Sequence, residues 1–132
     1  MDKRAAKRDY KLSHRPMGVF QIRNVTNERV FVASSMNLPG AFNSNRFQLE
    51  MGNHRNKMLQ ADWNELGADK FEFEILEEVP ERSDTGYDYK ADVEFLEDLW
   101  LEKLEPYDDR GYNVRKKTRE ERLRMIAANR ND

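Results

Sequence analysis

Alternating apolar and polar residues predict strands in three places along the chain. Residues 17–23 and 29–34 carry aromatic and β-branched side chains on either side of a polar stretch. Residues 71–75 alternate phenylalanine or isoleucine with glutamate. The first two runs predict a hairpin around an asparagine-containing turn, and the third predicts a half-buried strand.

Apolar residues spaced three or four positions apart predict helices elsewhere. One helix is expected after the Pro39-Gly40 pair, a second over about 56–66, and the longest over about 88–104. Residues 111–114 predict a turn into a short edge strand.

The order of these elements predicts an α/β (α+β) fold, with a small central, mainly antiparallel three-stranded sheet flanked by helices. We expect one domain over residues 17–114, behind a basic N-terminal arm over residues 1–16. A charged C-terminal helix is expected within residues 115–132, where Thr118 and Glu121 form a capping box.

A single carboxylate interrupts the apolar face of the longest predicted helix. Five apolar side chains share that face: Val93, Leu96, Trp100, Leu101 and Leu104. Glu97 lies on the same face, and a carboxylate directed at a core needs a hydrogen-bond partner, an ion pair or a metal ion. A single carboxylate suits Mg²⁺, which keeps several water ligands. Alternatively, Phe95 and Leu99 rotate the helix and leave Glu97 at the rim.

Charge is unevenly distributed along the chain, whose net charge is −2. Six Lys and Arg against two acids give residues 1–16 a charge of +4, and eight against three give residues 110–132 a charge of +5. Residues 17–109 therefore carry −11. An acidic body is a poor general trap for a phosphate backbone, whereas the basic termini suit nucleic acid. The alternative is that the termini are solvated tails.

The composition excludes several classes of protein. The chain has no cysteine, which excludes a disulfide framework and thiolate zinc sites and fits a reducing compartment. It has no run of about 18 apolar residues, and no apolar stretch follows the charged N-terminus. We therefore expect a cytoplasmic protein without a membrane partner.

Five different short motifs follow one another along residues 17–114. They are Gly18-Val19-Phe20, Phe31-Val32-Ala33-Ser34-Ser35, His54 with Leu59-Gln60, Leu96-Glu97-Asp98-Leu99-Trp100, and Gly111-Tyr112-Asn113. In this order and spacing the chain resembles the GIY-YIG nucleases, and in size it is similar to small stand-alone bacterial proteins with that domain. The resemblance implies hydrolysis of phosphodiester bonds.

The resemblance also implies a distinct catalytic role for each residue of the site. Tyrosines of the first two motifs activate water and orient the site, and an arginine on the first helix neutralises phosphoryl charge. The glutamate that matches Glu97 holds one divalent ion, so Mg²⁺ is the expected cofactor. Asn113 matches the asparagine of the closing motif.

The chain departs from that pattern at the chemically active positions. The two motif tyrosines are Phe20 and Phe31, which lack the hydroxyl and which we expect to pack together across the hairpin. The final glycine of the second motif is Ala33, and the arginine position falls at Ala41. The resemblance therefore predicts a pseudoenzyme, a magnesium-dependent endonuclease fold without most of its catalytic side chains.

Three other residues are candidates for the degenerate site. Arg46 is one candidate to replace the arginine missing at Ala41, although it lies five residues further on, about 140° away around a helix. Arg23 on the first strand is a second candidate for that role. His54 contacts substrate or metal in one interpretation, and serves as a loop residue or helix cap in the other.

Three functions remain open at this point. The first is an inactive or weak nuclease domain that binds nucleic acid through its basic termini, or binds a protein. The second is an active magnesium-dependent DNA endonuclease that uses Glu97 with a relocated base and arginine. The third is a protein-interaction module, including a homo-oligomer.

Overall fold

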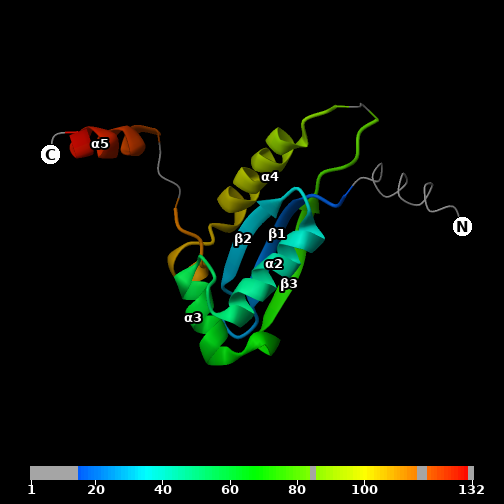
Figure 1. The fold of residues 1–132 in the computed structure, drawn as a ribbon, viewed down its shortest axis with the longest axis vertical. Helices are drawn as coiled ribbons and strands as arrows, with labels where there is room; N and C mark the ends of the chain where they lie inside the picture. The colour runs from blue at the N-terminus through cyan, green and yellow to red at the C-terminus, as the bar shows by residue number, and fades with distance from the viewer. Residues whose placement is uncertain (1–14, 84–85, 116–118, 131–132) are drawn as a thin grey trace, which may run out of the picture.

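A three-stranded antiparallel sheet forms the centre of the protein. The structure, a computed structural model, describes residues 15–83, 86–115 and 119–130. The strands are β1 (Gly18–Asn24), β2 (Val30–Ser35) and β3 (Phe71–Glu78). Their order in the sheet is β2-β1-β3, so the predicted hairpin and third strand are confirmed (Figure 1).

Helices cover both faces of this sheet. Helices α2 (Leu38–Met51) and α3 (Lys57–Leu66) lie on one face, and α4 (Tyr89–Leu104) lies on the other. The remaining helical elements are α5 (Arg119–Arg130) and the short 3₁₀ turns η1 (Ala68–Lys70) and η2 (Asp108–Arg110). Figure 1 shows α5 apart from the layered body. The predicted fold class is therefore confirmed.

Side chains of β1 alternate between the two faces of the sheet, so each packs either against α2 and α3 or against α4. Phe20 and Ile22 face α2 and α3 and belong to the main core cluster with Leu38 and Leu59. Val19 has the opposite parity and packs with residues of α4. The same two-sided pattern in β2 explains why β1 and β2 are largely buried on both faces, whereas β3 is only half-buried.

The apolar face of α4 is directed at the sheet, as the sequence predicts. Val93 and Leu101 are buried, whereas Phe95 is 62% and Leu99 44% exposed. The interpretation in which Phe95 and Leu99 rotate the helix is therefore wrong. Glu97 keeps its place on the packed face.

Side-chain caps define where the helices begin. The Asn37 side chain accepts from the backbone N–H of Gly40, so Pro39 and Gly40 lie inside the first turn of α2 instead of before it. Proline is tolerated there because the N–H groups of the first helical turn have no acceptor within the helix, so the N–H that proline lacks costs no hydrogen bond. Asn56 caps α3 in the same way. Thr118, of the predicted capping box, lies outside the described residues.

The outer edge of β2 is closed by the segment after η2. Gly111 forms a parallel bridge with Val30, and the backbone N–H of Tyr112 donates to the Val30 carbonyl. The Asn113 amide both donates to and accepts from the Val32 backbone at 2.8 Å. The predicted short edge strand at residues 111–114 is thus a strand-like brace of three residues.

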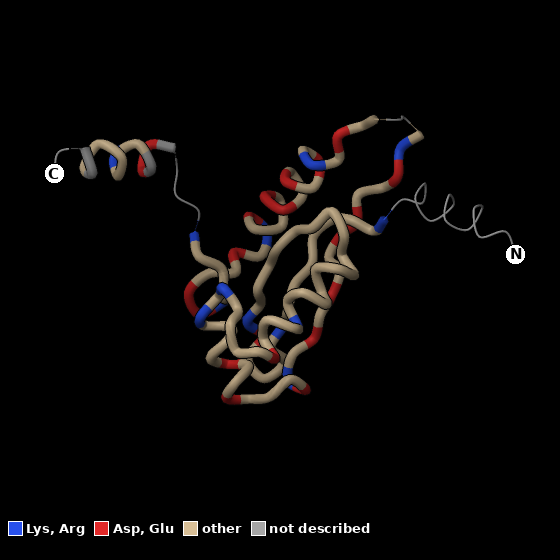
Figure 2. Tube along the Cα trace, viewed as in Figure 1, with Lys and Arg blue, Asp and Glu red and all other residues tan. Residues whose placement is uncertain are grey.

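Acidic residues are frequent along α4 and β3, which Figure 2 marks in red on the Cα trace. The β3 acids are Glu72, Glu74, Glu77 and Glu78. Among the described residues, no helix is long and apolar enough to span a membrane.

We predict that Gly18→Ala destabilises the protein more than Gly52→Ala. Gly18 has φ +152°, and a Cβ there would overlap the backbone oxygen of Glu77 on β3. Gly52 also has a positive φ, of +78°, but a Cβ there meets no atom within 4 Å. Strain alone should cost about 1 kcal/mol at Gly52, whereas strain with overlap should cost roughly 3 kcal/mol at Gly18.

Urea unfolding of the two variants and the wild type measures this difference. Equal losses of unfolding free energy would show that the close approach of β1 and β3 does not require glycine.

Candidate functional site

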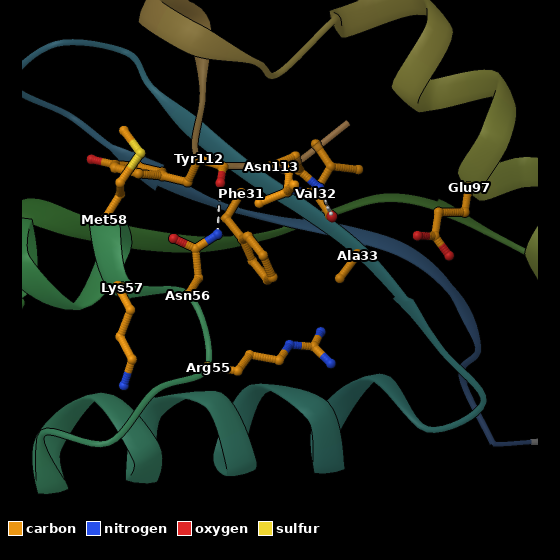
Figure 3. A pocket seen from close by; sticks show the side chains of 11 residues that line it. Phe31, Val32, Ala33, Arg55, Asn56, Lys57, Met58, Glu97, Tyr112 and Asn113 are labelled. Atoms are coloured by element: carbon orange, nitrogen blue, oxygen red, sulfur yellow. Dashed lines mark hydrogen bonds between the residues drawn. The ribbon is translucent and has the colours of Figure 1, made fainter. Parts of the chain in front are cut away.

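Two adjoining cavities at the edge of β2, here called the hollow, share the lining residues Ala33 and Arg55. Their volumes are about 510 Å³ and about 210 Å³. The larger is also lined by Phe31, Val32, Asn56, Lys57, Met58, Glu97, Tyr112, Asn113 and Val114. The smaller is also lined by Phe20, Ser34, Ser35, Ala41, Ser44, Asn45 and Gln48. The fold thus brings Phe31, Glu97 and Asn113 of the predicted site to the larger cavity (Figure 3) and Phe20 to the smaller one.

Glu97 reaches the hollow from α4 and has a hydrogen-bond partner on β2. The Ser34 hydroxyl donates to Glu97 Oε2, and the glutamate side chain is half-buried. This bond meets the need for a partner that the position of Glu97 on an apolar face creates. The carboxylate is therefore fixed in place while it still borders the larger cavity.

The two phenylalanines at the motif positions lie in the core and border the hollow. Phe20 is 1% exposed and packs edge-on against Phe42, and Phe31 is 6% exposed and packs edge-on against His54. They do not face each other across the hairpin, because the register places Phe20 opposite Ala33. Both belong to one core cluster, so they maintain volume without contributing a hydroxyl.

His54 is fully buried and its hydrogen bonds define its protonation. Its Nδ1 accepts from the Asn56 backbone N–H at 3.0 Å, so the ring proton lies on Nε2, 2.7 Å from the Asn45 Oδ1 that accepts it. Burial lowers the pKa of His54 below its ordinary value, and the nearby Arg55 charge lowers it further. A neutral ring with both nitrogens engaged braces the connection between α2 and α3.

The two arginines considered as stand-ins lie outside the hollow. The Arg23 guanidinium contacts Glu28, Glu72 and Glu74, and its hydrogen bond lowers the pKa of Glu74. The Arg46 guanidinium stacks over the ring of Phe73 at 4.7 Å. Neither residue lines either cavity.

A buried polar network supports the wall that carries Asn113. The Tyr112 hydroxyl donates to Asp62 at 2.6 Å and accepts from the Asn24 amide at 3.0 Å. Burial, together with the hydrogen bond to Asp62, raises the pKa of Tyr112 to about 12. Figure 3 shows this hydroxyl on the side of the ring away from Glu97, so Tyr112 shapes the cavity with its ring.

Sequence reasoning missed the one cation that both cavities share, Arg55. The motif pattern gives no signal for it, because the residue after His54 belongs to no motif. Its guanidinium lies over the Phe31 ring at 5.8 Å. Figure 3 shows it extended toward Ala33, whereas the ammonium group of Lys57 points away from that residue.

The hollow offers a divalent ion one carboxylate, Glu97. Among the described residues, no group of three or more His, Asp and Glu side chains is placed to hold a metal ion. Zinc sites need three or four protein ligands. Mg²⁺ is bound by one or two carboxylates and keeps several waters, so Glu97 with the neighbouring Ser34 hydroxyl fits Mg²⁺ and not zinc.

Comparisons with known proteins match both the sequence and the fold. No protein-family model matches the chain. Over 97 residues, 74% of the chain, it is 32% identical to intron-associated endonuclease 1 of Enterobacteria phage T4, and it spans 36% of that relative's length. The catalytic domain of the homing endonuclease I-TevI superposes with a TM-score of 0.63 and 31% identity, over 76% of this chain and 99% of that one. A mutant of that domain superposes with a TM-score of 0.63 and 30% identity, over 78% of this chain and 97% of the mutant's chain.

We predict that the protein loses stability as the pH falls below about 6.5, the ordinary pKa of histidine. Because the folded state lowers the pKa of His54, the unfolded chain binds a proton first as the pH falls. The stability present above that pH is therefore lost below it, at up to about 1.4 kcal/mol per pH unit.

Urea unfolding between pH 7.5 and 5.5 of the wild type and of His54→Asn measures the slope. The variant should be less stable at every pH but show a shallower dependence. An unchanged slope in the variant would mean that another group titrates in this range.

Proposed function

The chain belongs to the GIY-YIG nuclease family, and from that premise we propose that it is a degenerate member: a nucleic-acid-binding domain whose metal-dependent hydrolysis is weak or absent. The observation that carries this proposal is the lining of the hollow. Glu97 borders the larger cavity, while Phe20, Phe31 and Ala41 stand at the positions where the resemblance implies two hydroxyls and an arginine.

The hollow lacks a general base among its described lining residues. Within residues 15–83, 86–115 and 119–130, Glu97 is the only carboxylate that lines either cavity, and no histidine lines them. Both ring nitrogens of His54 are engaged, and the hydroxyl of Tyr112 is bound to Asp62. Loss of a base typically lowers the rate about 10²–10⁴-fold.

Ala41, in place of the implied arginine, removes a cation that would neutralise phosphoryl charge. This charge neutralisation is a second requirement of the reaction. An arginine in that role contributes roughly 10³–10⁵-fold in phosphoryl-transfer enzymes. The two losses need not multiply, because catalytic groups act as a unit. When Mg²⁺ is bound, it supplies Lewis-acid chemistry, and Glu97 with the Ser34 hydroxyl would hold it.

One observation favours the alternative of an active magnesium-dependent endonuclease. Arg55 brings a guanidinium into the same hollow as Glu97, which replaces part of what Ala41 lacks. That alternative still requires a base from outside the residues described above. A cleavage assay separates the two proposals.

We expect the wild-type chain to nick supercoiled plasmid in Mg²⁺ at the background rate. The triple variant Phe20→Tyr, Phe31→Tyr, Ala41→Arg should exceed background by at least about 10²-fold, the smaller of the two losses. Adding Glu97→Gln to that variant should abolish the gain.

Two results would contradict the degenerate assignment. Wild-type nicking that Glu97→Gln abolishes would establish the active alternative. A triple variant that folds but stays at background would show that the missing side chains are not the cause of inactivity.

We also expect the chain to bind nucleic acid in a strongly salt-dependent way, because the basic termini, with six and eight Lys and Arg in residues 1–16 and 110–132, would make most of the phosphate contacts. Fluorescence anisotropy with a labelled duplex and its single strand measures the affinity at several salt concentrations. Glutamine replacements of the six Lys and Arg in residues 1–16 should weaken binding and flatten the slope. Binding that ignores salt would exclude an electrostatic mode.

A further inference from the structure

Arg55 is anchored at its backbone while its side chain projects into the hollow. It follows the buried His54, whose backbone N–H donates to Gln60 Oε1 at 2.9 Å. On its other side, the Asn56 side chain donates to the Tyr112 carbonyl and also caps α3. A residue held between two fixed neighbours presents its side chain from a defined point, which limits the loss of entropy when a ligand binds.

The guanidinium of Arg55 lies free of ion pairs within the described part of the chain. It lies over the face of the Phe31 ring, with its Cζ atom 5.8 Å from the ring centroid. An aromatic face supports a guanidinium through a cation–π interaction and leaves its N–H donors in the ring-parallel plane available. Here the hydroxyl-free Phe31 serves as a platform for a cation.

The charges that line the hollow differ in sign from those of the surrounding body. Arg55 and Lys57 against Glu97 give the lining of the larger cavity a charge of +1. Residues 17–109 as a whole carry −11. A polyanion that approaches the domain is therefore repelled over most of the body and attracted at this edge of β2.

We infer that Arg55 is the phosphate-binding residue of this site, and that it holds one phosphodiester group of a nucleic-acid backbone in the hollow. The inference rests on the proposed nucleic-acid function and names the residue through which it operates. The planar fork of a guanidinium matches two phosphate oxygens, which is the reason arginine is preferred for this contact. Glu97, on the other side of Ala33 in Figure 3, keeps the anion on the arginine side of the hollow.

The position of Ala41 adds a second argument. Ala41 on α2 and Arg55 in the α2–α3 connection both line the smaller cavity. A methyl group at Ala41 leaves that space open, and Arg55 enters it from another wall. An arginine at either position would therefore serve the same bound phosphate, and one should be able to replace the other.

The test is fluorescence anisotropy of the full chain with a labelled DNA duplex and its single strand, without divalent ions. Arg55→Gln should weaken binding about fivefold to tenfold at low salt and lower the slope of log Kd against log salt by about one. Lys70→Gln is the matched control, because Lys70 is exposed and lines neither cavity. It removes the same charge and should leave both quantities close to wild type.

Two further variants separate a phosphate contact from a structural role. Arg55→Lys should keep the salt slope but lose part of the affinity, because an ammonium group lacks the planar fork. Ala41→Arg in the Arg55→Gln background should restore the affinity to within about threefold of wild type, since the net number of phosphate contacts is regained. Thermal melting of each variant shows that it is folded.

The outcomes distinguish this inference from the function on which it rests. If the wild type binds and Arg55→Gln binds equally well, the Arg55 site is wrong and nucleic-acid binding through other cations stands. If Arg55→Gln loses affinity but Ala41→Arg restores none, the shared phosphate position is wrong. A wild type that binds neither DNA probe would overturn both the inference and the proposed nucleic-acid function.

Discussion

The rest of this structure depends on the hydrogen bonding of one sheet edge. In the order β2-β1-β3, β2 has a partner on one side only, so its outward N–H and C=O groups need partners from elsewhere. Asn113 provides them with a side-chain amide, which donates and accepts as a peptide group does. This bond brings the segment after η2 back to β2, and the hollow exists because that segment, α4 and the α2–α3 connection meet along a single strand.

The same constraint explains how the site keeps its shape with phenylalanines at the two positions where the family resemblance implies tyrosines. The side chains that define the walls are held by core packing and by backbone hydrogen bonds, not by the groups that would act on a substrate. Phe20 and Phe31 occupy their positions in the core without a hydroxyl. Among the described residues, no buried side-chain nitrogen or oxygen lacks a hydrogen-bond partner. His54 bonds to Asn45 and to the Asn56 backbone, and Ser34 bonds to Glu97, so these polar groups are satisfied within the protein itself.

The sequence predicted the layers of the fold well because periodicity reports burial directly. The alternation in β1 and β3 and the apolar face of α4 each appear in the structure, including the place of Glu97. Its partner Ser34 was not predicted, since a hydrogen bond across 63 residues depends on the register between layers. The place of Arg55 in both cavities was beyond sequence reasoning for the same reason. A cation in a loop shows no pattern, and only the fold places it beside Ala41 and opposite Glu97.

The element that carries a phosphate-binding cation also decides what the site can do with the phosphate. In the proposal above the cation is Arg55, whose backbone is anchored on both sides but whose long side chain contacts one ring face only. Binding tolerates this freedom, because any pose that satisfies the guanidinium lowers the free energy of the complex. Catalysis does not, because a misplacement of about 1 Å can lower the rate on the order of 10²-fold. Under the proposal that Arg55 binds phosphate, a cation from the loop, in a hollow whose described lining holds no general base, favours retention of a nucleic-acid backbone over its cleavage.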